Sequence, residues 1–207
     1  LLQNSKKNYK CERFIYISSS MVYGDFQTNT VNENSAKNPK DIYGIMKLAG
    51  EVVTEGVCKL KKIPYTIIRP SAVYGPTDMN RRVSQIFIEN AFTNKEIVIE
   101  GKNEKLDFTF IEDLAKGCIL AGTKKQGINQ VFNITYGKGQ TLYSYVLNLK
   151  KLFPNLNYKI KPRDKTKPSR GTLSINKAKK LLGFKPEYNL KKGIKKYFNF
   201  LIKNEIF

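Results

Sequence analysis

The segment FIYISSSMVYG, Phe14 to Gly24, places a short run of apolar and aromatic residues directly before three consecutive serines. A short apolar run of this kind, bounded by polar residues, is typical of a strand that is buried on both faces of a parallel sheet. In α/β proteins, ligands bind at the carboxyl ends of such strands. The segment therefore predicts a strand over 14–17. It makes the hydroxyls of Ser18, Ser19 and Ser20 candidates for a binding site, although serine is also common where a chain turns.

A helix and a second strand follow this first strand. Asp41 is a good N-cap, and the residues after it carry apolar side chains at helical spacing, which predicts a helix over about 41–61. The apolar stripe of this helix consists of Ile42, Ile45, Met46, Ala49, Val52 and Val53. The run YTII then predicts a strand over 65–68. Strand, helix and strand make a βαβ unit, whose two strands are parallel and whose crossover is right-handed.

The rest of the chain continues to alternate between helices and short strands. Further strands are predicted at 97–101 and 131–135, and further helices at 84–92, near 112, and at 141–153, 176–182 and 190–203. The charged, proline-marked segment KIKPRDKTKPSRG, at 159–171, is expected to be a solvated loop. A buried parallel sheet usually has four to six strands, and fewer are evident here. We therefore expect the chain to be the C-terminal part of a longer protein.

Length and composition indicate a globular protein with a sizeable core, because 41% of the 207 residues are hydrophobic. No apolar run approaches the ~20 residues that a membrane span requires, so no membrane partner is expected. The three cysteines, Cys11, Cys58 and Cys118, are far apart and form no CxxC pair. They predict reduced thiols rather than a disulfide framework or a zinc site, and the cytoplasm is the expected location.

The chain contains no histidine. Serine and cysteine hydrolases that use a histidine base, zinc sites with histidine ligands and imidazole acid–base catalysis are therefore excluded. The net charge of +20 would suit a nucleic-acid partner, an anionic substrate or a simple compositional bias toward lysine. Because the lysines are dispersed and no nucleic-acid-reading motif is present, no nucleic-acid partner is expected.

The predicted helix over 41–61 carries the motif YGIMK, Tyr43 to Lys47. Residues four apart lie on the same face of a helix, so the phenol and the ammonium are about one turn from each other. A nearby positive charge stabilises a phenolate, which is the form in which tyrosine acts as a general base. A tyrosine and a lysine at this spacing also occur by chance. The other motifs in the sequence therefore decide whether YGIMK is interpreted as functional.

The order of the motifs resembles that of the extended short-chain dehydrogenase/reductases, and within them the NAD-dependent nucleotide-sugar epimerases and dehydratases. The matching segments are SSSMVYG at 18–24, YGIMK at 43–47, RPSAVYGP at 69–76, LDFTFIEDLA at 106–115 and KAKKLLGFKP at 177–186. The combination is specific, whereas each motif alone is not. Within LDFTFIEDLA, Asp107 and Asp113 are expected to have structural roles.

The resemblance implies an α/β fold in which a partial Rossmann-like parallel sheet is joined to a smaller α/β substrate-binding domain. Residues 1–76 would form the C-terminal half of the NAD-binding Rossmann domain. Residues 77–207 would be mainly the substrate-binding domain, with about 106–135 returning to the Rossmann core. The glycine-rich turn and the acidic ribose ligand of the family would precede residue 1.

The resemblance also implies roles for individual residues. Ser19 would be the catalytic hydroxyl, Tyr43 the general base, and Lys47 the residue that binds the nicotinamide ribose and supports the phenolate. The cofactor would be NAD, with NADP as an alternative. The implied cofactor-binding residues are Ser18, Tyr43, Lys47, Pro70 and Ser71.

A nucleotide-diphosphate sugar is the substrate that the resemblance implies. The implied substrate-binding residues are Ser19, Ser20, Arg81, Arg82 and Arg170. The forked guanidinium of arginine suits a diphosphate. Two positions depart from the family pattern, since Ala72 stands where many relatives have Asn and Leu106 where many have Arg. Relatives of this type dimerise through the helix that bears YxxxK, so a homodimer is also expected.

The implied activity is epimerisation through transient oxidation of the sugar to a ketone and its reduction from the other face. In the dehydratases, Asp and Glu usually follow the catalytic hydroxyl, whereas Ser20 and Met21 follow it here. This favours an epimerase or a ketoreductase over a 4,6-dehydratase. A dehydratase or ketoreductase on the same scaffold, and a fragment that only binds or assembles, remain as alternatives.

Overall fold

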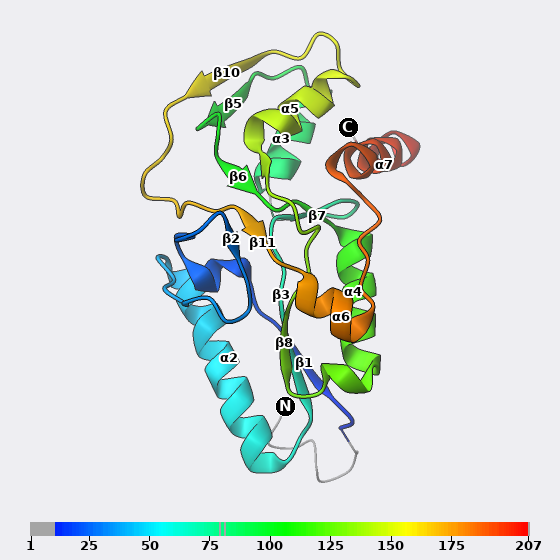
Figure 1. The fold of residues 1–207 in the computed structure, drawn as a ribbon. Helices are drawn as coiled ribbons and strands as arrows, with labels where there is room; N and C mark the ends of the chain where they lie inside the picture. The colour runs from blue at the N-terminus through cyan, green and yellow to red at the C-terminus, as the bar shows by residue number, and fades with distance from the viewer. Residues whose placement is uncertain (1–10, 79, 81, 207) are drawn as a thin grey trace.

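A parallel sheet of three strands forms the lower part of the molecule in Figure 1, a computed structural model in which residues 11–78, 80 and 82–206 are described. Its strands are β1 (Phe14–Ile17), β3 (Tyr65–Arg69) and β8 (Gln130–Asn133), in the order β1-β3-β8. Both pairings are parallel, so the carboxyl ends of all three strands lie at one edge. The predicted α/β fold with a parallel sheet is therefore confirmed.

Helices cover both faces of this sheet (Figure 1). On one face lies α2 (Ile42–Lys61), and on the other lie α4 (Ile111–Thr123) and α6 (Asn176–Leu182). Side chains alternate along the central strand, so Ile67 packs in a cluster with Cys58 of α2, whereas Ile68 packs with Ala121 of α4. Because β3 is covered on both sides, its five residues are all buried, as a continuous apolar run predicts.

The helix α2 begins where the sequence predicts but presents the opposite face to the sheet. The side chain of Asp41 accepts a hydrogen bond from the backbone of Gly44 at 2.7 Å, which is an N-cap. The apolar stripe, however, lies largely in solvent: Ile42 is 80% exposed and Met46 65%. The fully buried residues of α2 are Gly44, Glu51, Thr54 and Cys58. Periodicity thus identified the helix correctly, but most of its apolar stripe is left exposed by the residues that the structure describes.

A second group of short elements lies above the carboxyl edge of the sheet (Figure 1). Its paired strands are β4 (Val73–Tyr74) with β7 (Thr109–Phe110), β5 (Ile97–Glu100) with β10 (Tyr158–Lys161), and β6 (Lys105–Leu106) with β9 (Gln140–Thr141). Its helices are α3 (Val83–Phe92), α5 (Leu142–Lys150) and α7 (Leu190–Lys203). Between the two groups, β2 (Thr30–Val31) pairs with β11 (Thr172–Leu173), and the short helical turn η1 (Ser20–Tyr23) follows β1. A second short turn, η2 (Lys125–Gly127), lies at the other edge of the sheet, where the hydroxyl of Thr66 in β3 donates to its Gly127 carbonyl.

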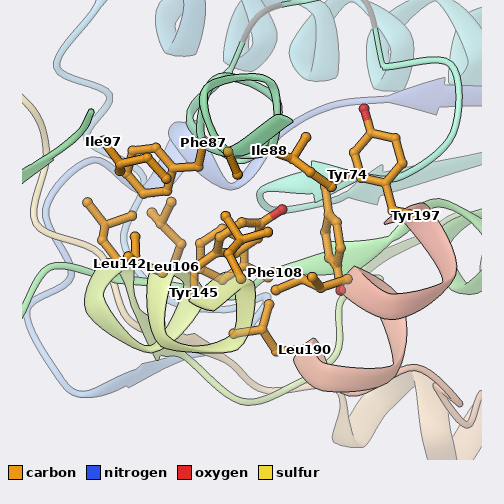
Figure 2. Packing of buried hydrophobic residues seen from close by; sticks show 14 of the residues in the cluster. Tyr74, Phe87, Ile88, Ile97, Leu106, Phe108, Leu142, Tyr145, Leu190 and Tyr197 are labelled. Atoms are coloured by element: carbon orange, nitrogen blue, oxygen red, sulfur yellow. The ribbon is translucent and has the colours of Figure 1, made fainter. Parts of the chain in front are cut away.

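Aromatic rings fill the core of this upper group (Figure 2). Tyr74 and Tyr145 meet edge to face with ring centroids 6.0 Å apart, and Tyr74 makes a similar contact with Phe108. The helix α7, which the sequence predicts at 190–203, packs Leu190 and Tyr197 into the same cluster. In the described part of the chain, no helix has the length and apolar character that crossing a membrane requires.

The charged segment at 159–171 does not form the simple solvated loop that its composition predicts. Its first residues continue β10, in which Ile160 pairs with Ile99 of β5. The exposed Lys159 and Lys161 flank that residue and hide the strand pattern in the sequence. The pairing partner is some sixty residues away along the chain, and local composition carries no information about it. Further along, Arg163 and Arg170 turn toward a cleft described below.

Two buried carboxylates in the segment 106–115 join parts of the chain that are distant in sequence. Asp107 is fully buried and accepts hydrogen bonds from Thr135 Oγ1 and from the backbone N–H groups of Gly137 and Leu173, each at 3.1 Å. Asp113 accepts two backbone hydrogen bonds, from residues 187 and 188, at 2.8 and 2.9 Å. These contacts agree with the structural roles expected for both residues.

Asp107 should make the stability of the protein depend on pH in a defined direction. Burial raises its pKa to about 6, although the hydrogen bonds it accepts act against this shift. In the unfolded chain the pKa of Asp is about 3.9. The folded state therefore retains the proton to higher pH. The contribution of Asp107 to the free energy of unfolding is largest below pH ~4 and falls, by up to the order of 3 kcal/mol, as the pH rises through about 6.

The variant Asp107→Asn cannot ionise and should lose this pH dependence. Urea unfolding of the protein and the variant, measured from pH 4 to pH 7, should show a difference in free energy of unfolding that changes with pH over this interval. Two curves that stay parallel across the whole interval would contradict the assignment.

Candidate active site

The three serines after β1 have three different environments. Backbone hydrogen bonds from Ser18 to Ile68 at 2.7 Å and from Ser20 to Pro70 at 2.9 Å hold this segment beside the end of β3. Ser18 is buried and its hydroxyl points to Glu51, at 2.5 Å. Ser19 caps η1, since its Oγ accepts a hydrogen bond from the backbone of residue 21. Ser19 and Ser20 line a cleft, whereas Ser18 faces the interior.

Tyr43 and Lys47 stand on the first turns of α2, beside these serines. The Tyr43 ring is 43% exposed and lines the same cleft as Ser19. The Lys47 Nζ donates a hydrogen bond to the carbonyl of Ile17, the last residue of β1, at 2.8 Å. It also lies 5.6 Å from the centroid of the Tyr43 ring. The helix therefore holds the phenol next to a fixed positive charge at the carboxyl edge of the sheet.

The cleft has a volume of about 650 Å³ and lies between the sheet and the upper group of elements. Ser19, Tyr43 and Pro70 line it from below. Its apolar walls come from the upper group and include Val83, Ile86, Phe87, Leu106 and Leu142. A hollow of this size, mostly apolar with a few convergent polar groups, is typical of a site for a small organic molecule.

Two arginines in the cleft have no carboxylate partner in the described part of the chain. The Arg82 guanidinium lies 6.0 Å from the centroid of the Tyr43 ring. The Arg170 Nε has no hydrogen-bond partner, and burial lowers the pKa of this guanidinium to about 10. By contrast, Arg163 pairs with Glu104 at 2.8 Å, and Lys167 is likewise bound to a glutamate. The cleft therefore offers to an anionic ligand two cations that are not engaged in a direct ion pair.

The remaining predicted site residues are brought together only in part. Pro70 lines the cleft beside Ser20, whereas the side chains of Ser18 and Ser71 are buried and are not among the residues that line it. Cofactor contacts by Ser18 and Ser71 stay a prediction. Arg81 lies outside the described residues. No group of His, Cys, Asp and Glu that could hold a metal ion occurs in the ranges described.

Sequence reasoning missed some residues at this site. Asp41, Arg163 and Lys167 also line the cleft. The segment that carries the last two residues was interpreted as solvated surface, and no local signal points to its distant partners. A buried ion pair between Glu51 and Arg69 lies directly behind the serines. Its glutamate lies eight residues after Tyr43, which is the same face of α2, so helical spacing could have identified it.

Residues 1–135 match the family model of the NAD dependent epimerase/dehydratase family. A relative from Methanocaldococcus jannaschii, which carries the provisional name UDP-glucose 4-epimerase, is 32% identical over 96% of this chain and 66% of its own length. A dTDP-D-glucose 4,6-dehydratase from Dictyostelium discoideum is 30% identical over 62% of this chain and 32% of its own length.

Solved structures with the same fold include two UDP-sugar epimerases. The UDP-glucuronic acid 4-epimerase of Bacillus cereus, in complex with UDP-glucuronic acid and NAD, has a TM-score of 0.90 and 28% identity, covering 99% of this chain and 65% of that one. The UDP-glucose 4-epimerase of Thermotoga maritima, with UDP-glucose, has a TM-score of 0.88 and 29% identity, covering 99% of this chain and 68% of that one.

The chain spans two thirds or less of the length of the curated relatives described above. Within that span, the family model matches more than half of the chain and includes both the serine segment and the YxxxK helix. The resemblance inferred from the motifs is confirmed: the chain belongs to the NAD-dependent epimerase/dehydratase family.

Proposed function

We propose that this chain carries the acid–base and substrate-binding groups of an NAD-dependent nucleotide-sugar epimerase. One observation supports the proposal most directly. The hydroxyl of Ser19 and the phenol of Tyr43 line one cleft, with Lys47 beside the phenol and two unpaired arginines among the other lining residues. Two proteins of the same fold that have been solved as complexes with UDP-sugars are epimerases.

The residues at the carboxyl edge of the sheet fit the nicotinamide end of a dinucleotide. Lys47 uses one N–H on the carbonyl of Ile17, which leaves its other two donors for a ribose. Pro70 supplies an apolar wall beside them. This is the edge at which α/β sheets bind such ligands. Bound NAD would accept a hydride from the sugar and return it, and NADP remains an alternative.

Tyr43 then acts as the general base in the proposed mechanism. Its phenolate takes the proton of a sugar hydroxyl while the carbon loses its hydride, and the positive charge of Lys47 stabilises the phenolate. Ser19 donates a hydrogen bond to the sugar oxygen as it becomes a carbonyl. After the keto-sugar turns over in the cleft, Tyr43 returns the proton to that oxygen. The result is inversion at one carbon without net oxidation.

The carboxylates in the cleft favour an epimerase over a dehydratase. Elimination of water needs a free acid and a free base beside the catalytic hydroxyl. Asp41 is engaged as the N-cap of α2, and Glu104 pairs with Arg163. The other two cleft carboxylates, at 100 and 164, are bound to Lys167.

A dehydratase or ketoreductase is the second candidate function, because a dehydratase is among the relatives. The third candidate is a fragment without catalytic activity that only binds a ligand or takes part in assembly.

A nucleotide-diphosphate sugar is the proposed substrate. Arg82 and Arg170 face the cleft without carboxylate partners, and the charge of Arg82 contributes to the lowered pKa of Arg170. Two like charges held close together are relieved by an anion between them. The diphosphate supplies that anion, while the apolar wall accommodates the rest of the ligand.

The expected assignment of residues to an NAD-binding domain and a substrate-binding domain is part of this proposal. Residues 1–76 and about 106–135 would belong to the NAD-binding domain, and the rest of 77–207 mainly to the substrate-binding domain, although α6 packs on the sheet. The sheet β1-β3-β8 supports this division, since β8 at 130–133 returns to pair with β3 after the chain has passed through β4, α3 and β5 of the upper group.

We also propose a cytoplasmic homodimer. The three cysteines are free thiols, which suits a reducing compartment. The exposed apolar stripe of α2 supports a dimer, because an amphipathic helix normally buries its apolar side. A second copy that presents the same stripe would cover it in the symmetric arrangement that is commonest in homodimers.

Replacing Tyr43 by phenylalanine tests the mechanism. Tyr43→Phe removes only the hydroxyl, so kcat for interconversion of an NDP-hexose by the full-length protein should fall by ~10²–10⁴-fold. The melting temperature should change little, because the ring is partly exposed. Tyr143→Phe, which removes a phenol outside the cleft, is the matched control and should retain activity. Undiminished turnover of Tyr43→Phe, followed by anion-exchange chromatography of the sugar nucleotides, would rule out this mechanism.

Replacing Arg170 by methionine tests the diphosphate site. Loss of a charge-assisted contact should weaken binding of a nucleoside diphosphate by roughly 10–100-fold in titration calorimetry, and binding of the monophosphate much less. Lys196→Met, which removes a cation on α7 outside the cleft, should bind as the unchanged protein does. Equal losses for the diphosphate and the monophosphate would place the phosphates elsewhere.

Replacing Met46 by glutamate tests the dimer. A charge in the stripe should be costly to bury, so Met46→Glu should convert a dimer into a monomer in sedimentation velocity. Ile119→Glu, at a residue of similar exposure on α4, is the control and should leave the dimer intact. A monomeric wild-type protein, or equal effects of the two changes, would contradict this interface.

A further inference from the structure

The inward face of α2 carries three functional groups in line. Tyr43, Lys47 and Glu51 are spaced four residues apart, so they lie along one face of the helix. Tyr43 is exposed to the cleft, whereas Glu51 is only 4% exposed. None of the fully buried residues of α2 is a large apolar side chain. The seating of this helix beside the cleft therefore combines these polar groups with apolar packing by Leu48 and Cys58.

The buried carboxylate of Glu51 contacts the ends of two strands at once. It accepts a hydrogen bond from Ser18 Oγ at 2.5 Å, directly before Ser19. It also accepts hydrogen bonds from Arg69 Nε at 2.9 Å and Nη2 at 2.7 Å, directly before Pro70. One side chain of the base-bearing helix is thus attached both to the segment with the catalytic hydroxyl and to the next strand of the sheet.

The remaining nitrogen of the Arg69 guanidinium, Nη1, binds residues that follow the serines in the sequence. This nitrogen donates to the hydroxyl of Tyr23 at 2.9 Å and to the carbonyl of Glu33 at 3.2 Å. The Tyr23 hydroxyl in turn donates to Asn133 Oδ1, at the end of β8, at 2.8 Å. Residues on both sides of Ser19 are therefore bound to this one ion pair, which spans the carboxyl ends of all three strands.

We propose that Glu51 and Arg69 are positioning residues, whose buried ion pair fixes the position of the Ser19 hydroxyl relative to the Tyr43 phenol. The inference rests on the epimerase mechanism proposed above. Neither residue lines the cleft, so neither is assigned a contact with substrate. The pair acts through the serine segment on one side and through α2 on the other.

Physical considerations favour a directional role over a purely stabilising one. Removing two charges from water costs about as much as their attraction returns, so an apolar pair of similar volume can be equally stable. What an apolar pair cannot supply is the fixed direction of the four hydrogen bonds that the planar guanidinium of Arg69 donates. Burial by itself acts to lower the pKa of Arg69. The hydrogen bonds and the charge of the bound Glu51 carboxylate outweigh this effect and raise the pKa above its ordinary value, so the guanidinium stays charged.

The test compares a single and a double variant of the full-length protein. Glu51→Gln leaves Arg69 buried without a counter-charge and should lower the melting temperature. The double variant Glu51→Met/Arg69→Met removes both charges and should recover most of that loss. If the pair positions the site, kcat of the double variant should stay ~100-fold low, since misplacement by about 1 Å costs this much, while KM changes less than threefold. Arg69→Lys, which keeps the charge but not the fork, should also have low kcat.

A second readout does not depend on activity. Amide hydrogen exchange in the segment 18–24 should be at least tenfold faster in the double variant than in the unchanged protein. Thr54→Val is the matched control, since this residue is also buried on α2 but lies outside the network, and it should alter neither kcat nor exchange. A folded double variant with kcat within threefold of normal would overturn the proposal.

Failure of the epimerase assignment can be told apart from failure of this inference. If the unchanged protein converts no NDP-hexose, hydrogen exchange carries the test: unchanged protection of 18–24 in the double variant would overturn the positioning role, and lost protection would support it. If the double variant does not fold, kcat and the hydrogen exchange of 18–24 are measured on Arg69→Lys instead. Normal values of both would overturn the positioning role, and a low kcat with faster exchange would support it.

Discussion

The parallel pairing of β1 with β3 is the constraint on which the site depends. Ile17, the last residue of β1, lies opposite Ile68, one residue before the end of β3, so the two strands end at the same edge of the sheet. A slip of one residue would reverse the side chains of a strand between its two faces. It would turn Ser18 away from Glu51 and would move the carbonyl to which Lys47 is bound. The register of two short strands thus determines which hydroxyl faces the cleft.

Buried polar side chains join the segments that these strands bring together. Asp107 links three stretches of chain, Asp113 holds the approach to α7, and the Glu51–Arg69 pair spans the ends of the sheet. Each of these groups is costly to bury unless its hydrogen bonds are made, so alternative arrangements of the same segments are penalised. Apolar clusters supply most of the driving force for folding, and these buried polar groups favour one arrangement of the segments over the others.

The electrostatics of the cleft differ from those suggested by the net charge. The chain has a net charge of +20, yet two cations in the cleft are neutralised locally, Arg163 by Glu104 and Lys167 by Glu100. Arg82 and Arg170 differ because no carboxylate of the described residues pairs with them, which makes them available to an anion. A site for a diphosphate is therefore an outcome of local pairing, and an excess of lysines over the whole surface neither creates nor excludes it.

The sequence by itself determined the local structure and the family. The strand at 14–17, the helix that begins after Asp41 and the YxxxK motif follow from short-range patterns, because caps and periodicity act within a few residues. The tertiary structure decided the rest. Periodicity reveals that α2 has an apolar stripe but not which side meets the sheet, and composition conceals the pairing of β10 with β5. Which serine faces the cleft, and which arginines stay unpaired, depends on partners far away in sequence, and only the folded chain brings these together.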